Sequence, residues 1–159
     1  TGSLRQGFSV AVGMATAGKM DGNPGRVYAL CGDGELQEGI IWEAALSAAH
    51  RNLDNLVLIV DWNGLQIDGK VDDVKKVTPL SGKFQTFGWH VINVDGHSFP
   101  EILAALDEAK AVKGQPTAII AKTHKGHGVS FMEDQAGWHG KAPNDEQFRQ
   151  AMEELGGVQ

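Results

Sequence analysis

The chain has 159 residues and a formal net charge of −6, and this negative charge argues against nucleic acid as a general partner. No apolar run approaches the roughly 20 residues that a membrane-spanning helix needs, so we expect no membrane contact. A single cysteine, Cys31, excludes a disulfide framework and favours a reducing, cytoplasmic location. The hydrophobic share of 42% and the charged share of 21% are typical of one globular domain with a proper core.

The first half of the chain predicts a helix followed by a strand, a second helix and a second strand. Residues 4–20 have apolar side chains at helical spacing, and the short apolar runs 27–31 and 56–60 predict buried strands. Between these runs, four residues share one helical face: Trp42, Ala45, Leu46 and Ala49. A strand, a helix and a strand at this length predict a βαβ unit, whose parallel strands end at the same edge of the sheet.

The second half predicts two more strands with a helix between them. In chain order we expect a polar surface loop over residues 68–79, a short helix over 80–87, and strands over 89–94 and 117–121. Ser98 and Glu101 predict a capping box for the helix between these strands. The buried face of that helix is expected to carry Ile102, Leu106 and Ala109. The whole pattern predicts an α/β fold, with a mostly parallel open sheet and helices on both faces.

A long loop and a last helix complete the predicted elements. Residues 122–142 are rich in Gly, His and Lys, and loops of this length in a compact domain are usually functional. Asn144 predicts the N-cap of the last helix, and Gly156 predicts its end. The apolar stripe of this helix is expected to contain Phe148, Met152 and Leu155.

Polar residues directly follow the first two predicted strands. Asp33 lies in the tetrad Gly32–Glu35, and Asn63 follows about thirty positions later in the segment Asp61–Leu65. Open α/β sheets bind ligands at the carboxyl edge of their strands, so we expect Asp33 and Asn63 to converge there. Carboxylate and amide oxygens, beside glycines that expose backbone N–H groups, suit a hard cation that holds a phosphate.

These residues carry a resemblance to a known family. The Gly32–Gly34 motif followed by Asn63 resembles the thiamine diphosphate signature. The segments Asp61–Gly69 and Gly137–Gly140 narrow the resemblance to transketolase, especially the kind made as separate N- and C-terminal subunits. The resemblance extends over nearly the whole chain and implies the diphosphate-binding domain of the thiamine diphosphate-binding fold. Because residue 1 is Thr and no Met begins the chain, we interpret residues 1–159 as this one domain without its N-terminal segment.

The resemblance also implies roles for individual residues. The side chains of Asp33 and Asn63 and the backbone carbonyl of Leu65 would hold Mg²⁺ or Ca²⁺. The cofactor-binding residues implied are Gly2, Ser3, Leu4, Gly34, Asn63 and His139. His139 is also the implied catalytic residue, because the matching family histidine faces the cofactor and substrate and can donate a hydrogen bond to a developing oxyanion.

Two further positions are notable within the resemblance. Glu38 matches a family glutamate at the subunit interface, near the active site. Arg5 departs from the family pattern, which usually has glycine at this position, and its side chain would either crowd the thiamine-binding loop or face solvent.

The implied function is transfer of a two-carbon ketol unit between sugar phosphates, a reaction of the pentose phosphate pathway, with thiamine diphosphate as cofactor. The expected partners are sugar phosphates, a C-terminal transketolase subunit or domain, and further copies of the same chain. We expect residues 1–159 alone to be inactive, because the family activates the cofactor with a glutamate on a separate pyrimidine-binding domain.

Other interpretations stay open at this point. Asp33 could cap a helix, Asn63 could form an Asx-turn, and His139 could be an ordinary loop histidine. The chain could belong to another thiamine diphosphate enzyme, such as a 1-deoxyxylulose phosphate synthase or a 2-oxo acid dehydrogenase, or be a non-catalytic cofactor-binding or assembly module. The remaining histidines lack the spacing of a zinc site: His50, His90, His97, His124 and His127.

Overall fold

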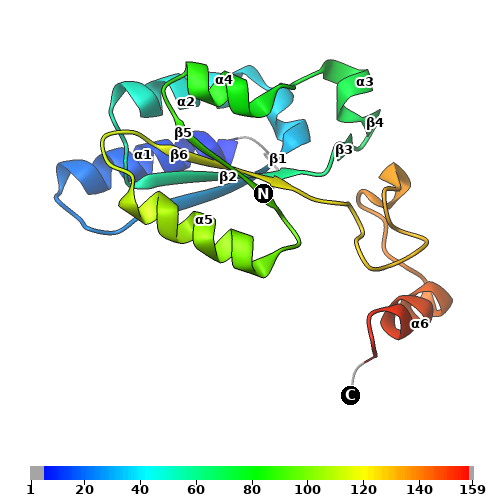
Figure 1. Cartoon of the computed structure of the whole chain (residues 1–159). Helices are drawn as coiled ribbons and strands as arrows, with labels where there is room; N and C mark the ends of the chain where they lie inside the picture. The colour runs from blue at the N-terminus through cyan, green and yellow to red at the C-terminus, as the bar shows by residue number, and fades with distance from the viewer. Residues whose placement is uncertain (1–5, 158–159) are drawn as a thin grey trace.

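A parallel four-stranded sheet forms the centre of the computed structural model, which describes residues 6–157 (Figure 1). Its strands lie in the order β1-β2-β6-β5, and each strand runs parallel to its neighbours. The strand bounds are Val27–Gly32 for β1, Leu56–Trp62 for β2, His90–Asp95 for β5 and Thr117–Lys122 for β6. The α/β fold class predicted from the sequence is therefore confirmed.

Helices cover both faces of this sheet, as expected for parallel strands joined by crossover connections. The helices α1 (Gln6–Met20), α2 (Gly39–His50) and α4 (Leu80–Thr86) pack on one face, and α5 (Phe99–Ala111) packs on the other. The central strand β2 is buried on both faces, which explains its continuous apolar run.

The face covered by α5 is only partly closed. Ala105 and Ala109 of α5 pack on β2, β5 and β6. The edge strand β1 extends beyond this helix, and its side chains Tyr28 and Leu30 are 45% and 70% exposed. An edge strand with exposed apolar side chains and unpaired backbone groups is a surface on which another chain segment can pair or pack.

The segment predicted as a polar surface loop over residues 68–79 contains regular structure, so this prediction was wrong. An antiparallel pair of short strands, β3 (Leu65–Gln66) and β4 (Gly69–Lys70), precedes the helix α3 (Val71–Lys75). Val71 and Val77 are buried in the main core, and they anchor this otherwise polar segment. Two isolated valines have no periodicity that would have predicted this packing.

Two predicted helix details differ from the structure. Leu46 of α2 is 53% exposed, whereas the buried positions are Ile41, Ala44, Ala45 and Ala48. The capping box at α5 is half formed, because the Ser98 hydroxyl accepts the Glu101 N–H, whereas the Glu101 carboxylate accepts the N–H of Asp95 instead of that of Ser98.

The last helix, α6 (Asp145–Glu154), lies apart from the sheet (Figure 1). Its predicted N-cap is confirmed, since the Asn144 side chain accepts the Gln147 N–H. The predicted apolar stripe is largely uncovered, with Phe148 54% and Leu155 59% exposed. Helix α6 is attached to the loop after β6 through Glu154, whose carboxylate accepts the Ser130 hydroxyl at 2.7 Å.

Candidate functional site

A cavity of about 440 Å³ opens at the carboxyl edge of the sheet, where β1 and β2 end. Three segments line it: the turn after β1, the turn after β2, and the loop that follows β6. They contribute Asp33 and Gly34, Asn63 and Leu65, and Lys125 and His139, respectively. Parallel pairing places the ends of β1 and β2 side by side, so residues about thirty positions apart share one cavity.

Asp33 joins the two turns. It begins the 3₁₀ helix η1 (Asp33–Gln37) and is completely buried. Its Oδ1 accepts the N–H of Gly34 at 3.0 Å, and its Oδ2 accepts the N–H of Gly64 at 2.8 Å. Burial raises the pKa of this carboxyl to about 6, although both backbone N–H groups act to lower it. A cation bound at this carboxylate would stabilise the ionised form.

Asn63 forms the Asx-turn that was one of the alternative interpretations. Its Oδ1 accepts the N–H of Leu65 at 2.9 Å, and its Nδ2 donates to Asp61 Oδ2 at 3.1 Å. Asp61 also accepts the hydroxyl of Thr123, from the loop after β6. An amide oxygen has two lone pairs, so the Asx-turn leaves Asn63 Oδ1 able to accept a second bond or to coordinate a cation.

Gly34 lies where no side chain fits. A Cβ at this position would be 2.9 Å from the Cβ of Gln66, closer than side chains normally approach. The Gln66 side chain lines the same cavity, and its buried Nε2 has no hydrogen-bond partner among the described residues. A close backbone approach and a buried amide donor without an acceptor are features that a bound polar ligand would explain.

The charges of the cavity lining favour a cation together with an anion. The lining formed by the described residues includes four acidic residues, Asp33, Glu35, Glu38 and Asp61. Against them it includes a lysine, Lys125. A diphosphate alone would meet repulsion from these carboxylates. A divalent cation between the diphosphate and the carboxylates removes this repulsion, and oxygen-rich donor sets of this kind suit Mg²⁺ or Ca²⁺. The residues present therefore fit a cation–diphosphate ligand.

His139 reaches the cavity from the far end of the loop after β6. It follows the 3₁₀ helix η2 (Ala136–Trp138), and its N–H donates to Ala136 O at 2.9 Å. The indole N–H of Trp138 donates to the carbonyl of Phe131 at 2.9 Å, which holds this turn against the rest of the loop. His139 is exposed, so its imidazole can meet a ligand at the mouth of the cavity.

The structure therefore brings together Asp33, Gly34, Asn63, Leu65 and His139, all of them predicted from the sequence. Glu38, the N-cap residue of α2, lines the same cavity. The predicted thiamine-binding residues Gly2, Ser3 and Leu4 lie outside the described residues, as does Arg5.

Sequence reasoning gave no site role to several residues of the cavity, among them Asp61, Gln66 and Lys125. Asp61 and Gln66 lie within the segment that carried the family resemblance, so their position was a usable signal. Lys125 had no comparable signal beyond its place in a long loop rich in glycine and lysine.

His139 is the histidine among the lining residues of this cavity, and the other described histidines do not line it. His50 ends α2, and His90 contacts Glu108 at 2.7 Å. Over residues 6–157 there is no group of three or more His, Cys, Asp or Glu side chains that could hold a metal ion, so a cation in the cavity would also need amide, backbone and diphosphate oxygens. Within the same residues no helix is long and apolar enough to cross a membrane.

Known proteins similar to this chain are transketolases. Residues 1–158 match the family described as the transketolase thiamine diphosphate binding domain. A 6-deoxy-6-sulfo-D-fructose transketolase subunit, SqwG, of Clostridium sp. (strain MSTE9) is 46% identical over 155 residues, which are 98% of this chain and 56% of that subunit. An apulose-4-phosphate transketolase subunit from Actinobacillus succinogenes is 43% identical, with the same coverage of 98% and 56%.

Among solved structures, the transketolase of Campylobacter jejuni superposes with a TM-score of 0.92 at 36% sequence identity. That match covers 99% of this chain and 26% of the Campylobacter chain. The chain thus spans about half the length of the subunit relatives and about a quarter of the longer transketolases. On the family match and these identities, the chain belongs to the transketolase family, as its N-terminal, thiamine diphosphate-binding domain.

Proposed function

We propose that this chain forms the diphosphate-binding part of a transketolase that transfers a two-carbon ketol unit between sugar phosphates. The observation that carries this proposal is the convergence of Asp33, Asn63 and His139 on one cavity at the carboxyl edge of the sheet. Family membership supports thiamine diphosphate as the cofactor.

Six residues of the cavity have roles in the proposal. Asp33 and Asn63 hold Mg²⁺ or Ca²⁺ through side-chain oxygens, and Leu65 contributes its backbone carbonyl. Lys125 balances the charge of the bound diphosphate, and the bare backbone at Gly34 lets the phosphate approach. Thiamine diphosphate supplies the carbanion chemistry when bound. His139 donates a hydrogen bond to oxygen atoms that gain negative charge during the reaction.

The contacts outside the described cavity complete the proposal. Residues 2–4 hold the thiamine through backbone groups, as the family resemblance implies. The names of two relatives, each a transketolase subunit, support a C-terminal partner chain or domain that activates the cofactor. Those names also support a sugar phosphate or sulfo sugar as the substrate. We further propose that the assembled protein works in the cytoplasm and contains more than one copy of this chain.

The proposal is tested with the full-length protein assembled with its partner. Isothermal titration calorimetry with thiamine diphosphate should show binding that depends on Mg²⁺, and a coupled assay should show ketol transfer between sugar phosphates. A pyruvate decarboxylation assay identifies the alternative thiamine diphosphate enzymes. Cofactor binding without either reaction would identify a non-catalytic module, and absence of cofactor binding would contradict the proposal.

A further inference from the structure

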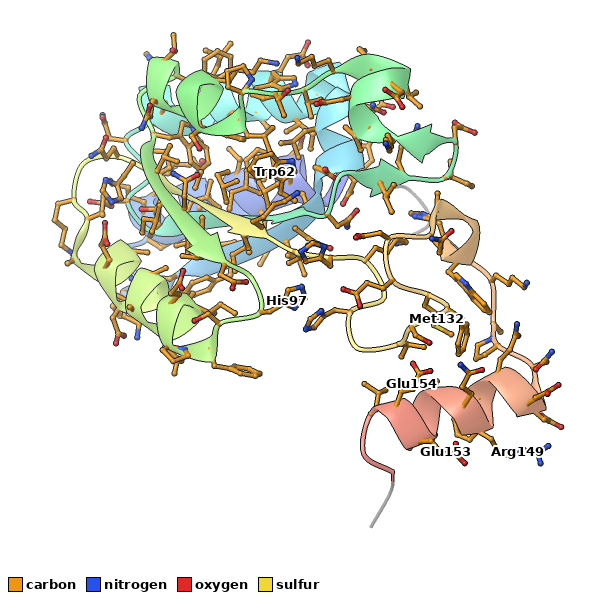
Figure 2. The ribbon with its side chains drawn as sticks, turned by 45° about the vertical axis from the view of Figure 1, so that its right-hand side comes forward. Trp62, His97, Met132, Arg149, Glu153 and Glu154 are labelled. Carbon is orange, nitrogen blue, oxygen red and sulfur yellow. The ribbon has the colours of Figure 1, made fainter. Side chains whose placement is uncertain are left out.

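The turn between β5 and α5 is docked against the loop that follows β6. His97 lies in this turn, and its Nε2 accepts the backbone N–H of His124 at 2.9 Å. The N–H of Gly96 donates to the carbonyl of Lys122 at 2.7 Å. A Cβ at Gly96 would be 2.3 Å from the Thr123 side chain, so the two segments touch closely here. Figure 2 shows His97 at the end of β5, beside this loop.

Three imidazole rings gather at this contact. The ring centroids of His97 and His127 are 3.9 Å apart with 27° between the planes, and those of His97 and His124 are 6.0 Å apart. Two of these rings face carboxylates of the same loop: His124 Nδ1 lies 3.2 Å from Asp134, and His127 Nδ1 lies 3.6 Å from Glu133.

The His97 ring has no such carboxylate among the described residues. Asp95, in the same turn, accepts the backbone N–H of His97 at 2.9 Å, and Glu101 of α5 accepts the backbone N–H of Asp95 at 2.8 Å. Both carboxylates accept backbone N–H groups, so the contacts of the His97 imidazole are those with the loop. The cation of Lys122 lies over the Trp62 ring instead, 4.5 Å from its centroid.

The geometry requires an uncharged His97. A backbone N–H can only donate, so Nε2 must carry a lone pair and the ring proton must lie on Nδ1. Protonation of His97 replaces this acceptor with a second donor and breaks the bond to His124. A protonated His97 ring would also lie with its centroid 3.9 Å from that of His127. The two rings would therefore repel each other whenever His127 is also charged. Among side chains, histidine is the one that ordinarily gains a proton on mild acidification, so acidification is the perturbation that tests this contact.

The same loop carries two residues of the candidate site. Lys125 directly follows His124, and its carbonyl accepts the N–H of Asp134 at 2.9 Å, which closes the loop on itself. His139 lies further along the loop, and both Lys125 and His139 line the cavity.

We infer that His97, in its neutral form, is a positioning residue that holds the loop after β6 in place and thereby sets Lys125 and His139 at the cavity. Protonation of His97 releases the loop and weakens ligand binding. The effect on ligand binding rests on the proposed function, whereas the effect on the loop does not.

Hydrogen exchange at the His124 amide tests the contact directly, because this N–H is the donor. The full-length, assembled protein is compared at about pH 8 and about pH 5.5, with rates corrected for intrinsic exchange. His97→Gln keeps a neutral acceptor at all pH values, and His97→Phe keeps a ring without an acceptor. His90→Gln, at the start of β5 and bound to Glu108, is the control for replacing a nearby histidine outside the contact.

We expect protection of the His124 amide in the wild-type protein to fall about fivefold on acidification, the effect of one hydrogen bond of typical net strength. The control should behave like the wild type, the Gln variant should stay protected, and the Phe variant should already show the reduced protection at the higher pH. Equal pH dependence in all variants, or a Phe variant as protected as the wild type at the higher pH, would overturn the inference.

Calorimetry with thiamine diphosphate and Mg²⁺ on the same proteins tests the consequence at the site. Protonation of Asp33 changes the cofactor affinity of all variants equally. The informative quantity is therefore the difference between wild type and His97→Gln in how affinity changes with pH. We expect affinity to fall more steeply with acidification in the wild type, and equal slopes would overturn the positioning role. A wild-type protein that does not bind the cofactor contradicts the proposed function, while the exchange data still decide the contact.

Discussion

Replacing Asp33 by Asn removes the buried charge of the candidate site and preserves the shape of the side chain. The carboxylate accepts two backbone N–H groups, from Gly34 and Gly64, and an amide can accept only one of them. The amide NH₂ then meets the other N–H, and a buried unpaired N–H costs about 1–3 kcal/mol. On hydrogen bonding alone, the substitution should destabilise the fold.

The removed charge offsets this loss. Burial raises the pKa of Asp33 from its ordinary value of 3.8 to about 6, so at pH 7 the carboxyl is still mostly ionised, but its ionisation costs more free energy in the folded than in the unfolded state. A difference of this size corresponds to a free-energy cost on the order of 3 kcal/mol. The two effects are similar in size and opposite in sign. We therefore expect the ligand-free Asp33→Asn variant to have a melting temperature within a few degrees of the wild type.

The effect of the substitution on ligand binding should be large by contrast. A ligand present at a hundred times its Kd stabilises the folded state by about 2.7 kcal/mol. In thermal unfolding with thiamine diphosphate and Mg²⁺, the wild-type assembled protein should show this stabilisation and the variant should lose most of it. An undiminished ligand-induced shift in Asp33→Asn would refute the assignment of Asp33 to the cation.

The pH dependence of the ligand-free protein provides a second measurement on Asp33. Because the folded pKa is about 6 and the ordinary value is 3.8, the folded state binds more protons between these values. The contribution of Asp33 to the free energy of unfolding should thus rise as pH falls from about 7 to about 4, by up to about 3 kcal/mol. In urea titrations over this pH range, the free energy of unfolding of the wild type should rise relative to that of Asp33→Asn as the pH falls. An equal dependence on pH in the two proteins would contradict this expectation.

Three further substitutions test other parts of the structure. Gly34→Ala should weaken cofactor binding measured by calorimetry, because its Cβ would lie 2.9 Å from Gln66, and unchanged affinity would count against a close phosphate approach. His139→Ala should lower turnover of the complete enzyme with little change in melting temperature, since the side chain is exposed; a large loss of stability with activity intact would instead indicate a structural role. Residues 1–159 expressed alone should self-associate in analytical ultracentrifugation and show no ketol transfer, and Leu30→Lys should reduce the association, because Leu30 is 70% exposed beside the half-exposed Tyr28. A wild-type chain of residues 1–159 that is monomeric, or that transfers ketol units, would contradict this expectation.

Local sequence patterns were sufficient to predict the elements that bring Asp33 and Asn63 together. The apolar run of β2 has the length and composition of a strand buried on both faces, and the helix before it has the spacing that makes β1 and β2 parallel neighbours. Once both strands end at one edge, the residues after them must lie near each other. This inference needs no long-range information, because each step depends on residues close in sequence.

Tertiary structure decided how the loop after β6 completes the site. The family resemblance predicted a role for His139, but Lys125 and His139 reach the cavity, and Thr123 reaches Asp61, because β6 pairs between β2 and β5, and strand order has no local signal. The buried state of Val71 likewise depends on a core assembled from distant helices. Periodicity reports which face of an element is apolar, but the free energy of packing depends on the neighbours that the fold supplies. For this reason the sequence by itself determined the strand ends and their ligand-binding edge, whereas the loop that closes the site and its contact with His97 became visible only in three dimensions.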